Sequence, residues 1–328
     1  MKKTLIALSV LAMAGSVNAA TVYDADGVTA GVFGDLEVGY KQAIGTNQDG
    51  ALFVGDYDFG FDASTAVNDD VKVFGKIQWN GNETSDDDAS QTESTNSPII
   101  DNAYIGVTAG DVTVTVGRAV NFVDEIGVAN DENIAGNYEA NDAIGIDDKT
   151  SQVAKVMWDN GEMFYAGLAY TADADGDDTT SNDYEQIDLK AGLRVADLDV
   201  MVIYSTAEDE AAADYDNLAI QANYSIDALS LGALYTSGEK DAAGTTSDIE
   251  ADAISLSVAY TMDKTTVGAG WSTIDVEGVQ DQDQWYANVS YALATNASVY
   301  VEIAETEGDA GSYANNDMGY AVGAKLSF

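Results

Sequence analysis

Apolar and polar residues alternate along most of the chain after residue 20. Between residues 186 and 195, one set of alternate positions carries Leu189 and Leu193, whereas the other carries Asp188 and Lys190. Successive side chains of a β-strand point to opposite faces, so a period of two places each set on its own face. The pattern predicts strands that have one apolar face and one hydrated face.

Sixteen such strands are expected, with short turns rich in Asp and Asn alternating with longer acidic loops such as 83–98, 173–183 and 239–249. This alternation predicts an all-β fold, a 16-stranded antiparallel transmembrane β-barrel with short periplasmic turns and long extracellular loops. A soluble β-sandwich is disfavoured, because it would not need aliphatic rows facing away from a wet interior. The expected strands are 29–44, 51–66, 71–82, 99–109, 112–119, 151–159, 162–172, 184–196, 198–207, 216–226, 229–238, 250–262, 265–276, 284–294, 298–306 and 317–328.

The first residues have the features of a secretory signal peptide. Lys2 and Lys3 precede an apolar run over residues 5–14, and small residues follow up to Ala19. We therefore expect cleavage between Ala19 and Ala20, which divides the chain into a signal peptide, 1–19, and a single barrel domain, 20–328.

The last strand places five residues on one face and ends on an aromatic side chain. This arrangement is similar to the carboxy-terminal signal of outer-membrane barrels, although it could also be simply a last strand. Together with the signal peptide, it predicts the bacterial cell outer membrane as the location and the barrel-assembly machinery as a partner. The residues of the expected signal are Tyr320, Val322, Ala324, Leu326 and Phe328.

Composition excludes several functions. The chain has 57 acidic and 13 basic residues, a net charge of −44, no histidine and no cysteine. Such a charge excludes nucleic-acid binding, and the missing residues remove the usual general bases and nucleophile pairs of enzymes. A mechanism using carboxylates alone stays open but has no focus. Acidic segments such as 86–88 and 173–178 could hold divalent cations, but solvated loops are the simpler interpretation, so neither metal nor cofactor is predicted.

Three segments carry a resemblance to a known family. The start Ala20-Thr-Val-Tyr-Asp-Ala-Asp-Gly27, the run Val116-Gly117-Arg118 before a long connection, and the terminal Phe328 are similar to those of the general bacterial porins of gammaproteobacteria. The resemblance covers the whole mature chain. It implies a homotrimer in which the third loop, here roughly residues 119–150, folds into the barrel and narrows it.

In such porins, acidic residues of the third loop face bases on the opposite wall. Here Arg118 matches one wall base, but Asp35 and Asp58 stand where others are expected. By simple alternation Arg118 would lie on the same face of its strand as Val114 and Val116. Either a bulge at Gly117 turns Arg118 inward, or these two valines face the lumen. The expected constriction residues are Asp35, Glu37, Asp58, Lys72, Lys76, Arg118, Asp124, Glu125, Asp131 and Glu132.

Carboxylates around a narrow aqueous passage attract cations and repel anions. We therefore expect a cation-preferring channel for ion transport and passive diffusion of small hydrophilic solutes, in contact with outer-membrane lipid and lipopolysaccharide. The inward acids could instead be solvated without a role in selectivity. A substrate-specific porin for sugars or peptides is the alternative, in which Phe33, Phe74, Tyr286 and Tyr300 either bind sugar or fill the wall. A cation-binding or adhesive barrel is a weaker alternative.

Overall fold

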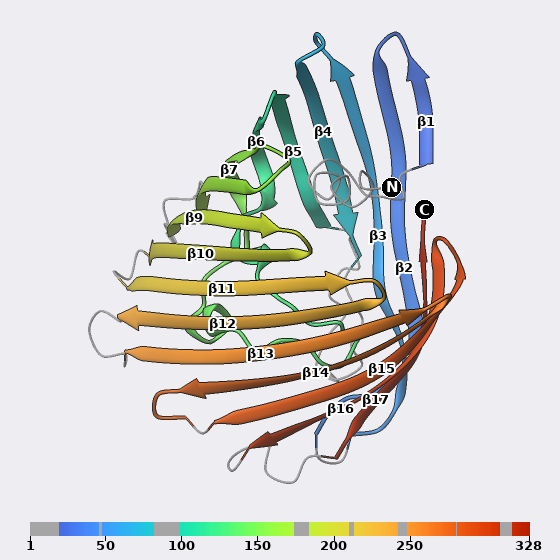
Figure 1. Ribbon diagram of the computed structural model, residues 1–328, viewed down its shortest axis with the longest axis vertical. Helices are drawn as coiled ribbons and strands as arrows, with labels where there is room; N and C mark the ends of the chain where they lie inside the picture. Colours follow the sequence, from blue (N-terminus) through green and yellow to red (C-terminus); the bar gives the residue numbers. More distant parts are fainter. Residues whose placement is uncertain are drawn as a thin grey trace.

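The computed structural model describes residues 20–45, 48–81, 99–173, 184–209, 213–241, 248–279, 281–308 and 317–328, most of them in antiparallel strands (Figure 1). Two short helices, η1 (Val123–Glu125) and α2 (Ala140–Ile144), lie between the strands that end at Val120 and begin at Lys149. No helix in these ranges is long and apolar enough to cross a membrane. The strands are β1 (Ala20–Ala25), β2 (Val28–Gln42), β3 (Ala51–Ala66), β4 (Val71–Asn80), β5 (Ile99–Ala109), β6 (Val112–Val120), β7 (Lys149–Asp159), β8 (Phe164–Asp173), β9 (Tyr184–Val195), β10 (Leu198–Asp209), β11 (Asp214–Ile226), β12 (Leu229–Asp241), β13 (Ile249–Met262), β14 (Thr265–Val276), β15 (Gln282–Ala294), β16 (Ala297–Gly308) and β17 (Gly319–Ser327).

The strands β2 to β17 form a closed barrel. Each pairs with its neighbours in sequence, and β17 returns to pair with β2 from Asp35 to Gln42. These are the sixteen expected strands, and no end differs from the expected one by more than three residues. Closure leaves no open edge of unpaired backbone groups, which is what a membrane requires of a spanning sheet. The sixteen-stranded antiparallel barrel is thus confirmed.

The strand β1 was not expected. It pairs with β2 over Val28–Val32, on the same edge of β2 that β17 uses further along. Between the two, Phe328 and Gly34 exchange backbone hydrogen bonds of 2.9 and 3.0 Å. The segments β1 and β17 therefore share one lane of the sheet. All six residues of β1 are exposed, and without a buried face they carry no clear alternation for sequence analysis to detect.

The wall has its apolar face outside. Leu189 and Leu256 are 52% and 48% exposed, whereas their neighbours Asp188 and Ser255 are 0% and 1% exposed. The polar residues of each strand thus point into the barrel and the aliphatic residues point out of it. This reversal of the arrangement in soluble proteins is expected where the outside is lipid.

Tight turns join the strands at one end of the barrel. Asp227 and Asp263 start two of these turns with φ values of 51° and 55°, a conformation that Asp tolerates better than most residues. At another turn, the Asn68 side chain accepts hydrogen bonds from the backbone of Asp70 and Val71, each 2.9 Å long. The expected signal peptide, 1–19, and most of the expected loops 83–98, 173–183 and 239–249 lie outside the described residues.

Large aromatic rings cover glycines on the inner wall. Phe33 lies over Gly60, its partner on β3, so closely that a methyl group at Gly60 would collide with the ring. Phe74 covers Gly106 on β5 in the same way. The rings therefore lie against the sheet instead of standing into the lumen. Other such pairs are Phe53 with Gly39, Tyr165 with Gly192, Tyr286 with Gly270 and Tyr300 with Gly323.

Candidate functional site

The connection from β6 to β7, residues 121–148, lies inside the barrel. Its backbone forms hydrogen bonds with inward side chains of strands far away in sequence, first on β9, β11, β15 and β16 and then on β12 and β9. Figure 1 shows this segment in green within the ring of strands. The bonds include Phe122 N to Asp188 at 3.2 Å, Gly127 N to Gln221 at 2.9 Å, Asn288 Nδ2 to Asn130 O at 2.6 Å, Ala140 N to Thr236 Oγ1 at 2.8 Å and Asp147 N to the Tyr184 hydroxyl at 3.1 Å.

A small apolar core holds the inward loop against one side of the wall. Phe122 and Ile144 are 0% and 2% exposed and belong to a cluster with Ile203 of β10 and Leu234 of β12. The helix α2 contacts β12 and β13. Burial of these side chains favours the packed loop by the hydrophobic effect. The loop is thus fixed along β8 to β13 by apolar contacts as well as by hydrogen bonds.

A buried carboxylate holds the middle of the loop. Glu302 on β16 is 0% exposed and accepts hydrogen bonds from three successive backbone amides, those of Glu132, Asn133 and Ile134, the last at 2.7 Å. Asn288 Nδ2 lies 3.3 Å from the same group. A carboxylate with several donors is a strong anchor, because charge-assisted hydrogen bonds exceed neutral ones.

Three of the expected constriction residues take part in this attachment. Lys325 on β17 pairs with Glu132, with its Nζ 3.0 Å from Oε2. Glu37 on β2 accepts hydrogen bonds from the Asn133 side chain at 3.1 Å and from the Tyr300 hydroxyl. Asp131 lies close enough to Glu302 for the two charges to interact. These acids were predicted to line the passage, and the structure places them where the loop meets the wall.

Opposite the loop, the inner wall of β2 to β5 is acidic. Asp35 and Asp58 are direct partners across β2 and β3, and Asp62 is opposite Lys76 across β3 and β4. The Asp58 side chain accepts a hydrogen bond from Gln78. The charges of Asp35, Asp58, Asp62 and Asp101 all act on Lys76. Three expected residues, Asp35, Asp58 and Lys76, are thus brought together on one wall.

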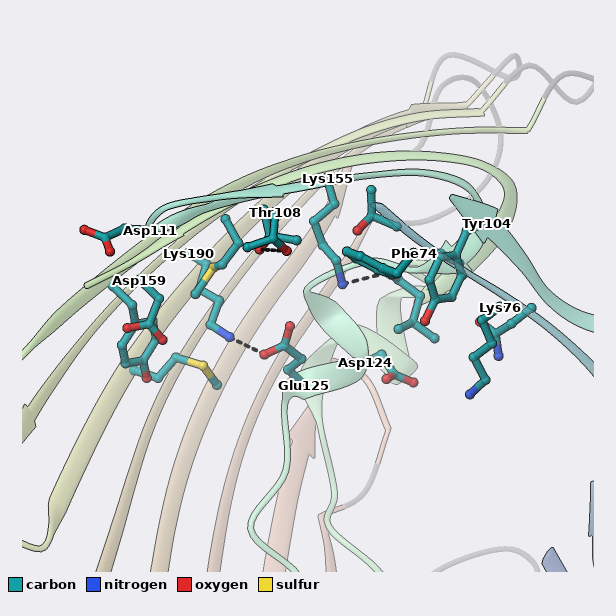
Figure 2. A pocket seen from close by; sticks show the side chains of 18 of the residues that line it. Phe74, Lys76, Tyr104, Thr108, Asp111, Asp124, Glu125, Lys155, Asp159 and Lys190 are labelled. Atoms are coloured by element: carbon teal, nitrogen blue, oxygen red, sulfur yellow. Dashed lines mark hydrogen bonds and ion pairs between the residues drawn. The ribbon is translucent and has the colours of Figure 1, made fainter. Parts of the chain in front are cut away.

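A cavity of about 720 Å³ lies between η1 and the inner faces of β4 to β11, and Lys76 and Asp101 are the residues of the acidic group that line it. Figure 2 shows Asp124 and Glu125 of η1 in the cavity, with Lys190 on one side and Lys76 on the other. Glu125 forms an ion pair with Lys190, whose side chain is 6% exposed. The charge of Glu125 in the loop is therefore partly neutralised by Lys190. The carboxylates of β2 to β5, in contrast, surround a single lysine, Lys76.

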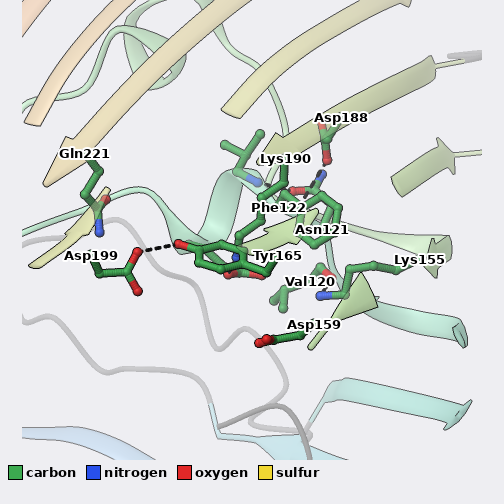
Figure 3. A network of polar contacts seen from close by, with 12 residues as sticks. Val120, Asn121, Phe122, Lys155, Asp159, Tyr165, Asp188, Lys190, Asp199 and Gln221 are labelled. Atoms are coloured by element: carbon green, nitrogen blue, oxygen red, sulfur yellow. Dashed lines mark hydrogen bonds and ion pairs between the residues drawn. The ribbon is translucent and has the colours of Figure 1, made fainter. Parts of the chain in front are cut away.

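A group of bases on β7 and β9 was not predicted as part of the site. Lys155, Lys190 and Arg194 all line the cavity. Arg194 holds Asp159 through two bonds of 2.9 Å and lies 4.2 Å above the Tyr165 ring. Figure 3 shows the neighbouring bond of 2.6 Å from the Tyr165 hydroxyl to Asp199. Lys190 and Arg194 belong to the polar set of alternate positions in their strand, which predicts that they point inward. Alternation alone does not predict that they line a cavity beside the loop.

Arg118 and Lys72 lie away from the other expected residues. Arg118 is paired with Ala103 on β5, whose neighbours Asn102 and Tyr104 line the cavity, so strand parity puts Arg118 on the outer face. Gly117 does form a bulge with φ of 140°, but Ala119, not Arg118, is the residue that points into the cavity. Both alternatives considered for Arg118 are therefore corrected: the bulge does not turn it inward, and Val114 and Val116 lie on the outer face, 38% and 57% exposed. Lys72 is exposed at the turn end of β4.

The inward aromatic residues do not form a projecting surface for sugars. Phe33, Tyr286 and Tyr300 are each 2% exposed, and Phe74 is 7% exposed. Each covers a glycine, and Tyr286 also accepts a hydrogen bond of 2.6 Å from Asn130 N. They fill the wall, which favours the second of the two roles considered for them.

The architecture can be compared with known proteins. The model of the Gram-negative porin family matches residues 4–311. The chain belongs to this family. A porin-like protein H of Photobacterium profundum is 30% identical over the full length of both chains. These relatives place this porin in the outer membrane of a Gram-negative bacterium, as expected from the sequence.

Solved porin structures share the fold. An anion-selective porin from Comamonas acidovorans superposes with a TM-score of 0.78 at 14% identity, over 92% of this chain and all of that one. The trimer form of an outer membrane protein, OmpT, of Vibrio cholerae gives a TM-score of 0.74 at 19% identity, over 92% of this chain and all of that one. At such identities the likeness concerns the barrel alone. The charge pattern of the passage must be argued from this porin's own residues.

Proposed function

We propose that this porin is a passive diffusion channel for ions and small hydrophilic solutes and that it prefers cations. The observation that carries the preference is the pairing of Asp35 with Asp58 directly across two inner strands. Like charges in that position destabilise a sheet unless something else favours them. Cations in the passage would reduce the repulsion between the two carboxylates. A role in attracting cations therefore accounts for a pairing that otherwise destabilises the sheet.

The surrounding charges support the same direction. Asp62 and Asp101 lie on the same wall and Lys76 is the base among them, whereas Glu125 across the cavity is already paired with Lys190. At a separation of about 8 Å and an effective dielectric constant near 40, one unit charge acts on a passing ion by roughly 1 kcal/mol before salt screening. A few such carboxylates are enough to set selectivity.

The fold does not decide between cations and anions, because the Comamonas porin with a similar barrel is anion-selective. General diffusion is favoured over a sugar-specific passage because the inward rings lie flat over glycines. We also propose that the protein works as a homotrimer in contact with outer-membrane lipid and lipopolysaccharide. The likeness to a trimeric barrel supports the assembly.

The test is a reversal-potential measurement in a planar bilayer under a potassium chloride gradient. We expect the double variant Asp35→Lys, Asp58→Arg to lower the cation-to-anion permeability ratio several-fold, because four charge units change near the passage. The matched control is Arg118→Ala, which alters charge on the outer face and should leave the ratio unchanged. A wild type that prefers chloride, or an unchanged ratio in the double variant, would overturn the proposed preference.

A further inference from the structure

One lysine in the passage is held by an aromatic ring instead of by a carboxylate. The Nζ of Lys76 lies 4.6 Å from the centre of the Phe33 ring. Phe33 itself is 2% exposed and covers Gly60, where a methyl group would collide with it. Glycine, ring and ammonium thus form a stack that rises from the inner wall.

The stack keeps Lys76 apart from acids within its reach. Asp62 is its direct partner across β3 and β4, yet the ion pairs formed by the described residues do not include Lys76. One buried oxygen of Asp62 and one of Asp58, Oδ1 in each case, have no hydrogen-bond partner. A lysine surrounded by carboxylates would ordinarily form an ion pair with one of them. Here the attraction between the cation and the ring face competes with that pairing.

We infer that Phe33, a neutral residue, is a positioning residue for charge selectivity. By holding the Lys76 ammonium over its ring, it leaves the charges of Asp58 and Asp62 without an ion-pair partner among the described residues, so that their field acts on cations that pass along the wall. This inference rests on the proposed cation channel and adds a residue that sets how strongly the channel prefers cations.

Stacks of the same kind occur elsewhere on the inner wall. Lys325 lies 5.0 Å from the ring centre of Tyr300, which covers Gly323, and Arg194 lies above Tyr165, which covers Gly192. In both, the base also forms ion pairs, so the ring is not its sole attachment. Lys41 lies 5.0 Å from the ring centre of Phe53, which covers Gly39, and it too is absent from the ion pairs of the described residues. In the Lys76 stack the charges of Asp35, Asp58 and Asp62 act on the base, so removing the ring would release it toward a carboxylate.

The experiment compares four variants by reversal potential in a potassium chloride gradient. Phe33→Leu should lower the cation-to-anion ratio about two-fold without changing any formal charge, because the freed ammonium moves toward a carboxylate and weakens its field. Phe33→Tyr keeps the ring and should retain the wild-type ratio. Lys76→Gln should raise the ratio, and adding Phe33→Leu to it should change nothing further, because no ammonium remains to be released.

The matched control is Phe74→Leu, which removes a ring that covers Gly106 and lies under no base among the described residues. It should leave the ratio unchanged. Each variant is first checked for a heat-dependent mobility shift and open-channel conductance, so that a misfolded barrel is not read as a result. An unchanged ratio in Phe33→Leu, or an equal shift with and without Lys76, would overturn the inference. A wild type that conducts no ions or prefers chloride would instead overturn the proposed function.

Discussion

Two carboxyl groups of the inward loop have pKa values raised by their surroundings. Burial and the neighbouring charge of Glu302 raise the pKa of Asp131 to about 6. Burial and the charge of Asp142 raise the pKa of Glu139 to about 7. At neutral pH both groups therefore stand close to the point where they exchange protons, and packing of the loop is linked to pH.

The sign of this linkage follows from the raised values. An acid whose pKa is higher in the packed loop binds more protons there than in the released loop, so acidification favours packing. For Glu139 the effect develops as pH falls through about 7 and is complete below its ordinary value of 4.5. We expect hydrogen-exchange protection of amides 121–148 to rise between pH 8 and pH 5, by about 4 kcal/mol at most, with the larger part from Glu139 and the rest from Asp131.

The variant Glu139→Gln is the matched test of that prediction. It keeps the shape of the side chain and removes its titration, so most of the pH dependence of loop protection should disappear. Glu162→Gln, an exposed change in a tight turn, serves as the control and should leave the dependence intact. Protection that falls on acidification, after correction for intrinsic exchange, would contradict the assigned direction.

Among the elements, β17 has a defined task in closing the barrel. Its outward residues Tyr320, Val322 and Leu326 are 37%, 50% and 44% exposed, and Phe328 beyond it is 44% exposed. The Phe328 ring also lies against Gly34, with which its backbone exchanges hydrogen bonds. The same residue therefore serves both the outer apolar face and the seam with β2.

We expect deletion of Phe328 to block assembly while leaving secretion intact. Loss of the residue removes two backbone hydrogen bonds at the seam and the terminal aromatic group proposed to be read by the assembly machinery. The amount of heat-shifted barrel in outer-membrane fractions measures the effect, with Phe328→Tyr as the conservative control. Wild-type amounts of folded truncated protein would show that the residue is dispensable.

The strands were predictable because each carries its own signal. Alternation placed Asp35, Glu37 and Asp58 on the inner face, as the structure does. The path of the loop was not predictable, because its middle is fixed by Glu302, about half the chain away, and no local pattern links the two. For the same reason Glu132 and Asp131 were assigned to the open passage. Arg118 was left ambiguous because a bulge hides strand parity, which only the pairing with Ala103 resolves.

On the scale of the whole molecule, the closed barrel makes a prediction about assembly and stability. We expect the protein to fractionate with outer membrane as a trimer and to change mobility on heating in detergent, because a closed sheet has no edge from which to fray. Electrophoresis of heated and unheated samples, with cross-linking, is the measurement. A monomer recovered from periplasmic extract would be incompatible with it.

The alternation of polar and apolar residues also bears on how the chain reaches its membrane. In β9 the inward charged residues Asp188, Lys190 and Arg194 alternate with outward residues that include Leu189 and Leu193. Inserted as a helix, each such charge would cost about 3 kcal/mol near the centre of a bilayer. The translocation machinery of the inner membrane would therefore pass this strand on instead of releasing it sideways into lipid. The apolar surface comes into being only when the sheet forms, so the unfolded chain can cross one membrane and the folded barrel can reside in the next.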